Sequence, residues 1–298
     1  MKPLYRLTPH ARLNHNPLFA LETRRIIWGY SAKTLTDYSL FIVGVTCAFI
    51  ILAWLVIRLG ERYPSRLNDF SLALLALSLF ASLLLDYRCI STALDSINGE
   101  VAARRWDLLR LTTLDHHQIV AAKYGAAQVR VWRLLMLITA LRLGVVLTVG
   151  LSTLIFMVQD SVGVARTPGE TISNLLAQLV LVVVAMIYVA EPFWRMRMVT
   201  ALGMAISARA QRHTSSVLVG IGALAALWLA QGVILAALSI GVSVVIMPLA
   251  LVEYSANGLI FCSPAIFLIV VFVAFYGLYS SVRVWSLRRA VRWAARID

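Results

Sequence analysis

The sequence contains few charged residues and few cysteines for its length. Of its 298 residues only 14% are charged, and 60% are apolar, whereas an ordinary soluble domain has about 25% charged and about 45–50% apolar residues. Such a chain cannot cover its apolar surface with water-facing side chains. Its three cysteines include no Cys-x-x-Cys pair, so neither a disulfide framework nor a thiol metal site is expected. These shortages exclude a soluble globular enzyme, a disordered chain and a disulfide scaffold.

The sequence also lacks the motifs of catalysis and nucleotide binding. It contains no Gly-x4-Gly-Lys-Ser/Thr, no His-Glu-x-x-His and no Gly-x-Ser-x-Gly, which are the patterns of a phosphate-binding loop, a zinc protease and a serine hydrolase. His116 and His117 are adjacent, so on a helix their side chains point about 100° apart and make a poor metal site. We therefore expect no catalytic residue, no metal and no cofactor in this chain.

What the sequence does contain is long runs without charge. A helix needs about 20 residues to cross about 30 Å of hydrocarbon, and six runs are candidates for such spans. The predicted fold is therefore all-α, a polytopic membrane protein whose residues 1–298 form one transmembrane domain. The six runs are residues 38–57, 70–85, 143–159, 171–190, 214–252 and 254–282.

Two of these runs have an unusual length for one crossing. Residues 70–85 are too few, so this helix must extend past Asp86. Residues 214–252 are about twice as many as one crossing requires. Because Pro248, Gly258 and Pro264 follow closely, we predict re-entrant or broken helices at 241–264, before the last span. Additional full spans are the competing interpretation.

The distribution of basic residues predicts the orientation in the membrane. The net charge is +13, and six alternating spans place 22 of the Lys and Arg residues on one side and four on the other. By the positive-inside rule, both termini and the segment 88–133 then face the cytoplasm, in what we expect to be a bacterial inner membrane. The positive charge is explained by topology, so no nucleic-acid partner is expected.

The two ends of the chain are predicted to contact lipid headgroups. Residues 1–36 include an apolar stretch interrupted by basic residues, at 18–35, which is typical of an interfacial helix. The tail at 283–298 mixes tryptophans with arginines. A solvated helix end with snorkelling arginines is the alternative for the tail.

The segment 88–133 has a composition that is unusual for a connector. Residues 96–124 are predicted to form a short helix, a turn at 111–115 and a second helix that continues into the third span. Apolar side chains within a charged rim are typical of an interface centre, although a helix on lipid headgroups is an alternative. The predicted docking surface comprises Glu100, Arg104, Arg105, Trp106, Asp107, Leu108, Leu109, Leu111, Thr112 and Leu114.

A spaced motif runs through this segment. It consists of Gly99-Glu100, Trp106-Asp107-Leu108-Leu109, Leu111-Thr112, Leu114, Ile119 and Lys123. This pattern resembles the cytoplasmic coupling segment of ATP-binding-cassette (ABC) type 2 permeases, G-E-x4-T-W-D-L-L-x-L-T-P-L-S-x-x-E-I-x-x-G-K. The sequence departs from that pattern, without a change of register, at Arg105, Thr113, Asp115, Gln118 and Ala122.

Two further matches to that family lie elsewhere in the chain. Asn16-Pro17 with Glu22 and Arg24 matches N-P-x4-E-x-R before the first span, and Gly203 with Ser207 follows the fourth. The resemblance implies a permease subunit that couples to a separate ATPase, which binds ATP and Mg²⁺. It also implies a second permease subunit, identical or paralogous, because six spans form half of the usual pathway.

Arg142 is the most conspicuous charge inside a predicted span. An ionised side chain at that depth is expected to face the bundle interior or water. We predict that Arg142 pairs with Asp86 or Glu191, which lie at the ends of the second and fourth spans. A role on the substrate path and snorkelling are the alternatives.

The sequence thus predicts the permease of an ATP-driven exporter. Two other functions compete with it: a structural or assembly subunit of a larger membrane complex that transports nothing, and a membrane-embedded transferase. Spans rich in Leu, Val and Ala mildly favour an amphipathic or lipid-like cargo.

Overall fold

The structure is a computed structural model that describes residues 9, 13, 15–24, 32–60, 65–112, 114–161, 168–209, 213–241 and 262–296. Within these ranges the chain is helical and contains no strand, as the apolar runs predict. The helices are α3 (Pro17–Arg24), α4 (Ala32–Gly60), α5 (Ser65–Ala102), α6 (Trp106–Arg110), α7 (His116–Ser161), α8 (Pro168–Arg209), α9 (His213–Gly241) and α11 (Cys262–Ala294).

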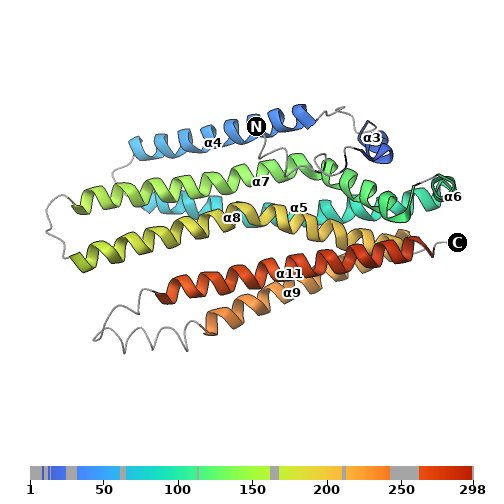
Figure 1. The fold of residues 1–298 in the computed structure, drawn as a ribbon. Helices are drawn as coiled ribbons and strands as arrows, with labels where there is room; N and C mark the ends of the chain where they lie inside the picture. Colours follow the sequence, from blue (N-terminus) through green and yellow to red (C-terminus); the bar gives the residue numbers. More distant parts are fainter. Residues whose placement is uncertain are drawn as a thin grey trace.

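The long helices lie side by side in an elongated bundle (Figure 1). Helices α5, α7 and α8 pack against one another, α4 packs on α7, and α11 packs along α8. The short helices α3 and α6 and the C-terminus gather at one end of the bundle. We call this end the α6 end.

Four helices of the described chain are long and apolar enough to cross a membrane. They cover Thr36–Leu59, Asp69–Ala102, His116–Thr153 and Ser215–Ile234, which correspond to the first, second, third and fifth predicted spans. The second continues past Asp86, as its short apolar run requires. An integral membrane protein is therefore supported by length and composition.

The fourth and sixth predicted spans fall only partly on described residues. The backbone of residues 171–190 belongs to α8, and that of 262–282 belongs to α11, but many side chains of both segments lie outside the described residues. The predicted re-entrant segment at 241–264 also lies largely outside them. The count of six spans and the re-entrant helices therefore stay predictions.

Much of the segment 88–133 is helix, and α7 is the predicted second helix that continues into the third span. Helix α5 continues to Ala102 and α7 begins at His116, so the connection between them is short and contains α6. Helix α7 has 46 residues and a length of about 69 Å, more than twice the hydrocarbon thickness of about 30 Å. The docking segment is therefore held at the end of two long helices.

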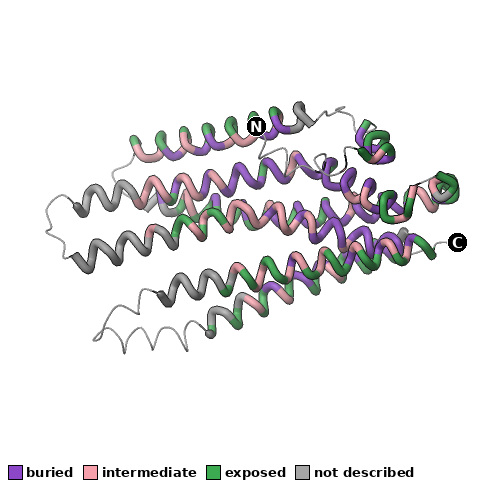
Figure 2. The backbone as a smooth tube through the Cα atoms, viewed as in Figure 1, coloured by how far each residue is buried: buried purple, intermediate pink, exposed green. Residues whose placement is uncertain are grey.

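The core is formed mainly by α5, α7 and α8. Buried residues gather along the middle of these helices and toward the α6 end (Figure 2). Gly203 of α8 allows a close approach to α5, because a Cβ atom there would lie 2.7 Å from Cβ of Ala93. Nearby, Ser207 Oγ donates a hydrogen bond to the Leu94 carbonyl oxygen at 2.6 Å and accepts one from the Asn98 amide at 3.2 Å. Gly203 and Ser207, which match the family pattern, therefore lie where α8 packs closely against α5.

The predicted basic tail is the last part of α11. Its small residues Ser286, Ala290 and Ala294, spaced four apart, are buried, and α11 packs along α8. Arg288 and Arg292 are exposed. One face of the tail is therefore packed against the bundle, so the tail does not lie wholly on headgroups.

Candidate functional site

A cluster of four charged side chains lies inside the bundle. Arg142 of α7 approaches Glu191 of α8, with 2.7 Å between Nη1 and Oε2, which confirms the predicted pairing of Arg142 with an acid. Asp86 of α5 does not pair with Arg142 but with Arg195, whose Nε and Nη2 donate hydrogen bonds to it at 2.6 to 2.9 Å. Arg195 also lies 3.4 Å from Glu191.

Uncharged partners extend the cluster to α9 and α11. The Trp228 indole N–H of α9 donates to Asp86 Oδ2 at 2.9 Å. The Tyr279 hydroxyl of α11 donates to Glu191 Oε1 at 2.7 Å and accepts a hydrogen bond from Gln231 at 3.1 Å. Five helices, α5, α7, α8, α9 and α11, therefore contribute to one polar network.

The Arg142 guanidinium is enclosed by several groups. Its Nη1 donates to the Tyr188 carbonyl oxygen at 2.6 Å, and its Nη2 donates to Ser82 Oγ at 2.9 Å. It also lies over the Tyr188 ring, 4.6 Å from the ring centroid, and the Tyr188 hydroxyl bonds to Ser78. Arg142 therefore does not snorkel toward the membrane surface.

The cluster balances two carboxylates against two guanidiniums. The exposed fraction of the side chain is 0% for Asp86, 4% for Arg142, 11% for Arg195 and 17% for Glu191. Charges in an apolar bundle persist when each has an opposite partner. The pairing makes the cluster electrically neutral as a whole, so it can remain inside the membrane.

A cavity of about 420 Å³ opens beside this network. Arg142, Glu191, Arg195, Gln231 and Tyr279 form part of its wall, together with aromatic side chains of α11. Volumes of this order are typical of small-molecule sites. The arrangement can offer both positive and negative hydrogen-bonding groups to a polar part of a ligand, against an otherwise apolar wall.

Arg195 and its uncharged neighbours are the members of this cluster that sequence reasoning missed. In the sequence, Arg195 enters only the count of basic residues that predicts the orientation, as one of those that follow the fourth span. A signal was available, because Glu191 and Arg195 are four residues apart and therefore share a helix face. Gln231, a polar residue in an apolar run, was a second signal.

A second polar cluster lies at the α6 end and joins three distant segments. Lys123 of α7 is 3.0 Å from Glu22 of α3 and 3.1 Å from Glu100 of α5, and its side chain is only 3% exposed. Arg130 lies 3.3 Å from the other oxygen of Glu22. Each of the acids at Glu22 and Glu100 belongs to a motif that carries the family resemblance.

Asn16 completes this junction. Its side-chain oxygen accepts hydrogen bonds from the backbone N–H groups of Leu18 and Phe19 at 3.0 and 3.3 Å, which caps α3. Its Nδ2 donates to the carbonyl oxygen of Gln118 at 2.9 Å, at the start of α7. The Asn-Pro motif therefore both begins α3 and attaches it to α7.

The position of Trp106 differs from the prediction. Trp106 was expected to project from an exposed helix, but it is 2% exposed and belongs to the same buried cluster as Ile97, Ile119 and Val120. The correction has a simple cause: α6 is only five residues long, and its first side chain lies between the ends of α5 and α7. The indole attaches α6 to the bundle.

The other residues of the predicted docking surface divide into two groups. Leu109 and Leu114 are partly buried against the same cluster, and Glu100 pairs with Lys123. Leu108 and Leu111 are 64% and 83% exposed. The remaining members, Arg104, Arg105, Asp107 and Thr112, are exposed.

The turn between α5 and α6 holds this surface in place. Arg104 has a φ of 53°, in the left-handed region that residues other than glycine rarely adopt. The amides of Arg104 and Arg105 donate to the carbonyl oxygens of Val101 and Glu100 at 3.0 and 2.9 Å. The backbone therefore reverses within a few residues.

Known proteins provide no match to this chain. Neither family models, nor curated proteins, nor solved structures match it. Among the described residues, no group of three or more His, Cys, Asp and Glu side chains is placed to hold a metal ion. The two clusters and the exposed leucines beside one of them are therefore the features of the molecule that point to a function.

Proposed function

We propose that the chain is the permease subunit of an ATP-driven ABC exporter, and that a separate ATPase subunit binds ATP and Mg²⁺ and docks on α6. The observation that carries the proposal is the junction at the α6 end. Glu22 belongs to the motif before the first span, Glu100 and Lys123 belong to the motif at 99–123, and the three side chains meet within hydrogen-bonding distance. Two motifs that serve one function are expected to lie in contact in the folded protein.

The docking surface that we propose is Leu108 and Leu111 with the charged residues around them. Exposed leucines that lie beyond a membrane span have no lipid to cover them, and apolar side chains in a polar rim favour a protein partner. Arg104, Arg105 and Asp107 supply that rim. Trp106 has the different role of transmitting force, because it joins α6 to the core.

The long helices offer a path from this surface to the membrane interior. Glu100 and Asp86 lie on the same helix, α5, about 21 Å apart along its axis. Lys123 and Arg142 both lie on α7. Movement of α6 by the ATPase would therefore shift α5 and α7 and change the geometry of the charge cluster and of the cavity beside it.

The proposed transport path needs a second permease subunit. The family resemblance implies a pathway between two subunits, because one six-span chain would supply half of it. The composition of the spans favours an amphipathic or lipid-like cargo. The orientation with both termini in the cytoplasm follows from the positive-inside rule.

The experiment compares the double variant L108D/L111D with L21D. Leu21 is 50% exposed and lies on α3, near the same end of the bundle. Each tagged variant is expressed in its native membrane, purified and tested for a co-purifying subunit with a phosphate-binding loop and for ATP hydrolysis. We expect L108D/L111D to lose the ATPase and its activity, with unchanged membrane insertion and melting temperature, and L21D to retain both.

Two results would contradict the proposal. The first is a wild-type chain that purifies without any such ATPase; a stable complex of other membrane subunits would then favour the assembly subunit. The second is full retention of ATPase binding and hydrolysis by L108D/L111D.

A further inference from the structure

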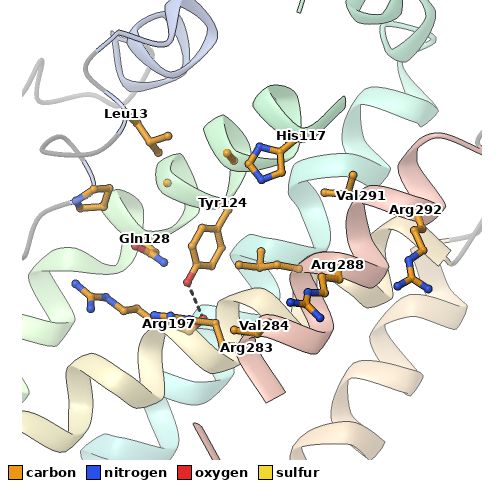
Figure 3. Close-up of a pocket in the computed structure, with 14 residues that line it drawn as sticks. Leu13, His117, Tyr124, Gln128, Arg197, Arg283, Val284, Arg288, Val291 and Arg292 are labelled. Atoms are coloured by element: carbon orange, nitrogen blue, oxygen red, sulfur yellow. Dashed lines mark hydrogen bonds between the residues drawn. The ribbon is translucent and has the colours of Figure 1, made fainter. Parts of the chain in front are cut away.

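A basic cavity lies between α7, α8 and the tail of α11. Its volume is about 550 Å³, and Figure 3 shows Arg197, Arg283, Arg288 and Arg292 around it. These arginines come from two helices: Arg197 from α8 and the other three from α11. The cavity is separate from the charge cluster and from the exposed leucines of α6.

The described residues of this wall do not balance the charge of its α11 arginines. They include four arginines and no acidic residue. For the described part of the chain, the structure records no ion pair of Arg283, Arg288 or Arg292. Several guanidiniums around one cavity without a carboxylate favour an anionic ligand, and guanidiniums match phosphate oxygens in shape as well as charge.

The remaining wall is mostly apolar and also includes His117, Tyr124 and Gln128. Val284, Leu287 and Val291 of α11 and Ala121 of α7 line the cavity, and Leu13 of the N-terminal segment lies at its side (Figure 3). On α11 the apolar residues and Arg288 recur at spacings of three and four, so they share one helix face. A ligand with an anionic head and an apolar body fits such a wall better than a free anion does.

The cavity also lies where lipid headgroups are expected. Arg283 directly follows residue 282, the predicted end of the last span. Trp285 is 51% exposed, and its ring centroid lies 4.9 Å from the guanidinium carbon of Arg289. Tyr276, nine residues before Trp285, is 47% exposed. Exposed tryptophan and tyrosine mark the interface between hydrocarbon and water.

From these observations we infer that the cavity binds the phosphate headgroup of an anionic phospholipid. Arg288 and Arg292 of α11 contact the phosphate from one side and Arg197 of α8 from another, while the acyl chains follow the apolar surface of the bundle. Basic pockets between membrane helices are suited to such headgroups. The inference goes beyond the proposed transport function and does not depend on it.

The test uses two double variants with the same net charge. R288Q/R292Q removes two arginines that line the cavity, and R289Q/R296Q removes two arginines of the same tail that do not line it. The full chain is purified in a non-ionic detergent. Binding of phosphatidylglycerol, of phosphatidylcholine and of inorganic phosphate is then measured by native mass spectrometry and by thermal shift.

We expect the wild-type chain to prefer phosphatidylglycerol to phosphatidylcholine. R288Q/R292Q is expected to weaken phosphatidylglycerol binding by about 10- to 30-fold, and R289Q/R296Q is expected to leave it nearly unchanged. Three results would overturn the inference: equal binding of the two lipids, equal loss in both double variants, or binding of inorganic phosphate as tight as that of the lipid. The last would assign the cavity to a soluble anion.

Discussion

Replacing Arg195 by glutamine tests the account of the buried charge cluster most directly. Arg195 Nη2 lies 2.6 Å from Asp86 Oδ2, and Asp86 is completely buried. Without the guanidinium, the carboxylate retains only the indole N–H of Trp228 as a recorded donor. The substitution therefore leaves an uncompensated charge in an apolar bundle.

The expected loss of stability is large. Removing one partner of a buried ion pair costs about 3–5 kcal/mol, and each kcal/mol shifts the melting temperature of a 150–250-residue domain by about 2–4 °C. We therefore expect Arg195→Gln to melt on the order of 10 °C lower. Arg289→Gln is the matched control: this exposed guanidinium stacks on Trp285, a contact that contributes about 0.5–1 kcal/mol.

The assay is thermal unfolding of the purified chain in detergent, followed by circular dichroism. A double variant, Asp86→Asn with Arg195→Gln, separates loss of a contact from exposure of a buried charge. Because no unpaired carboxylate remains, it should melt at a higher temperature than Arg195→Gln alone. The reasoning is refuted if Arg195→Gln melts like Arg289→Gln, or if the double variant shows the sum of the two single losses.

Three further substitutions test the packing of the bundle in the same assay. Gly203→Ala places a methyl group 2.7 Å from Cβ of Ala93 and should lower the free energy of unfolding by about 1–3 kcal/mol. Its control, Gly222→Ala, has nothing within 4 Å of the new methyl group and should be neutral or stabilising. Equal melting temperatures of the two variants would contradict this. Trp106→Ala should lower the free energy of unfolding by about 3–5 kcal/mol. Its control, Leu108→Ala, should change that free energy by no more than about 0.5 kcal/mol. A Trp106→Ala variant as stable as the wild type would show that the indole does not anchor α6. Asn16→Ala should cost about 1 kcal/mol through loss of the α3 cap; an unchanged melting temperature would show that the cap does not stabilise the protein.

Sequence alone determined the class of the protein and the location of most of its membrane-crossing helices. Uninterrupted apolar runs require burial in lipid or protein whatever the fold, so the first, second, third and fifth predicted spans correspond to helices of the structure. The same reasoning predicted an acidic partner for Arg142, since an isolated ion in a span is costly. These conclusions depend on local composition and on the solvent.

Only the tertiary structure decided which side chains meet. Asp86 and Glu191 were equal candidates for Arg142, and the rotation of α5 and α8 about their axes assigns Glu191 to Arg142 and Asp86 to Arg195. The rotation of α6 likewise buries Trp106 and exposes Leu108 and Leu111, although all three are apolar residues outside the spans. The rotation of a helix about its own axis is fixed by packing between segments far apart in the chain. It therefore cannot be predicted from the local pattern of a single sequence.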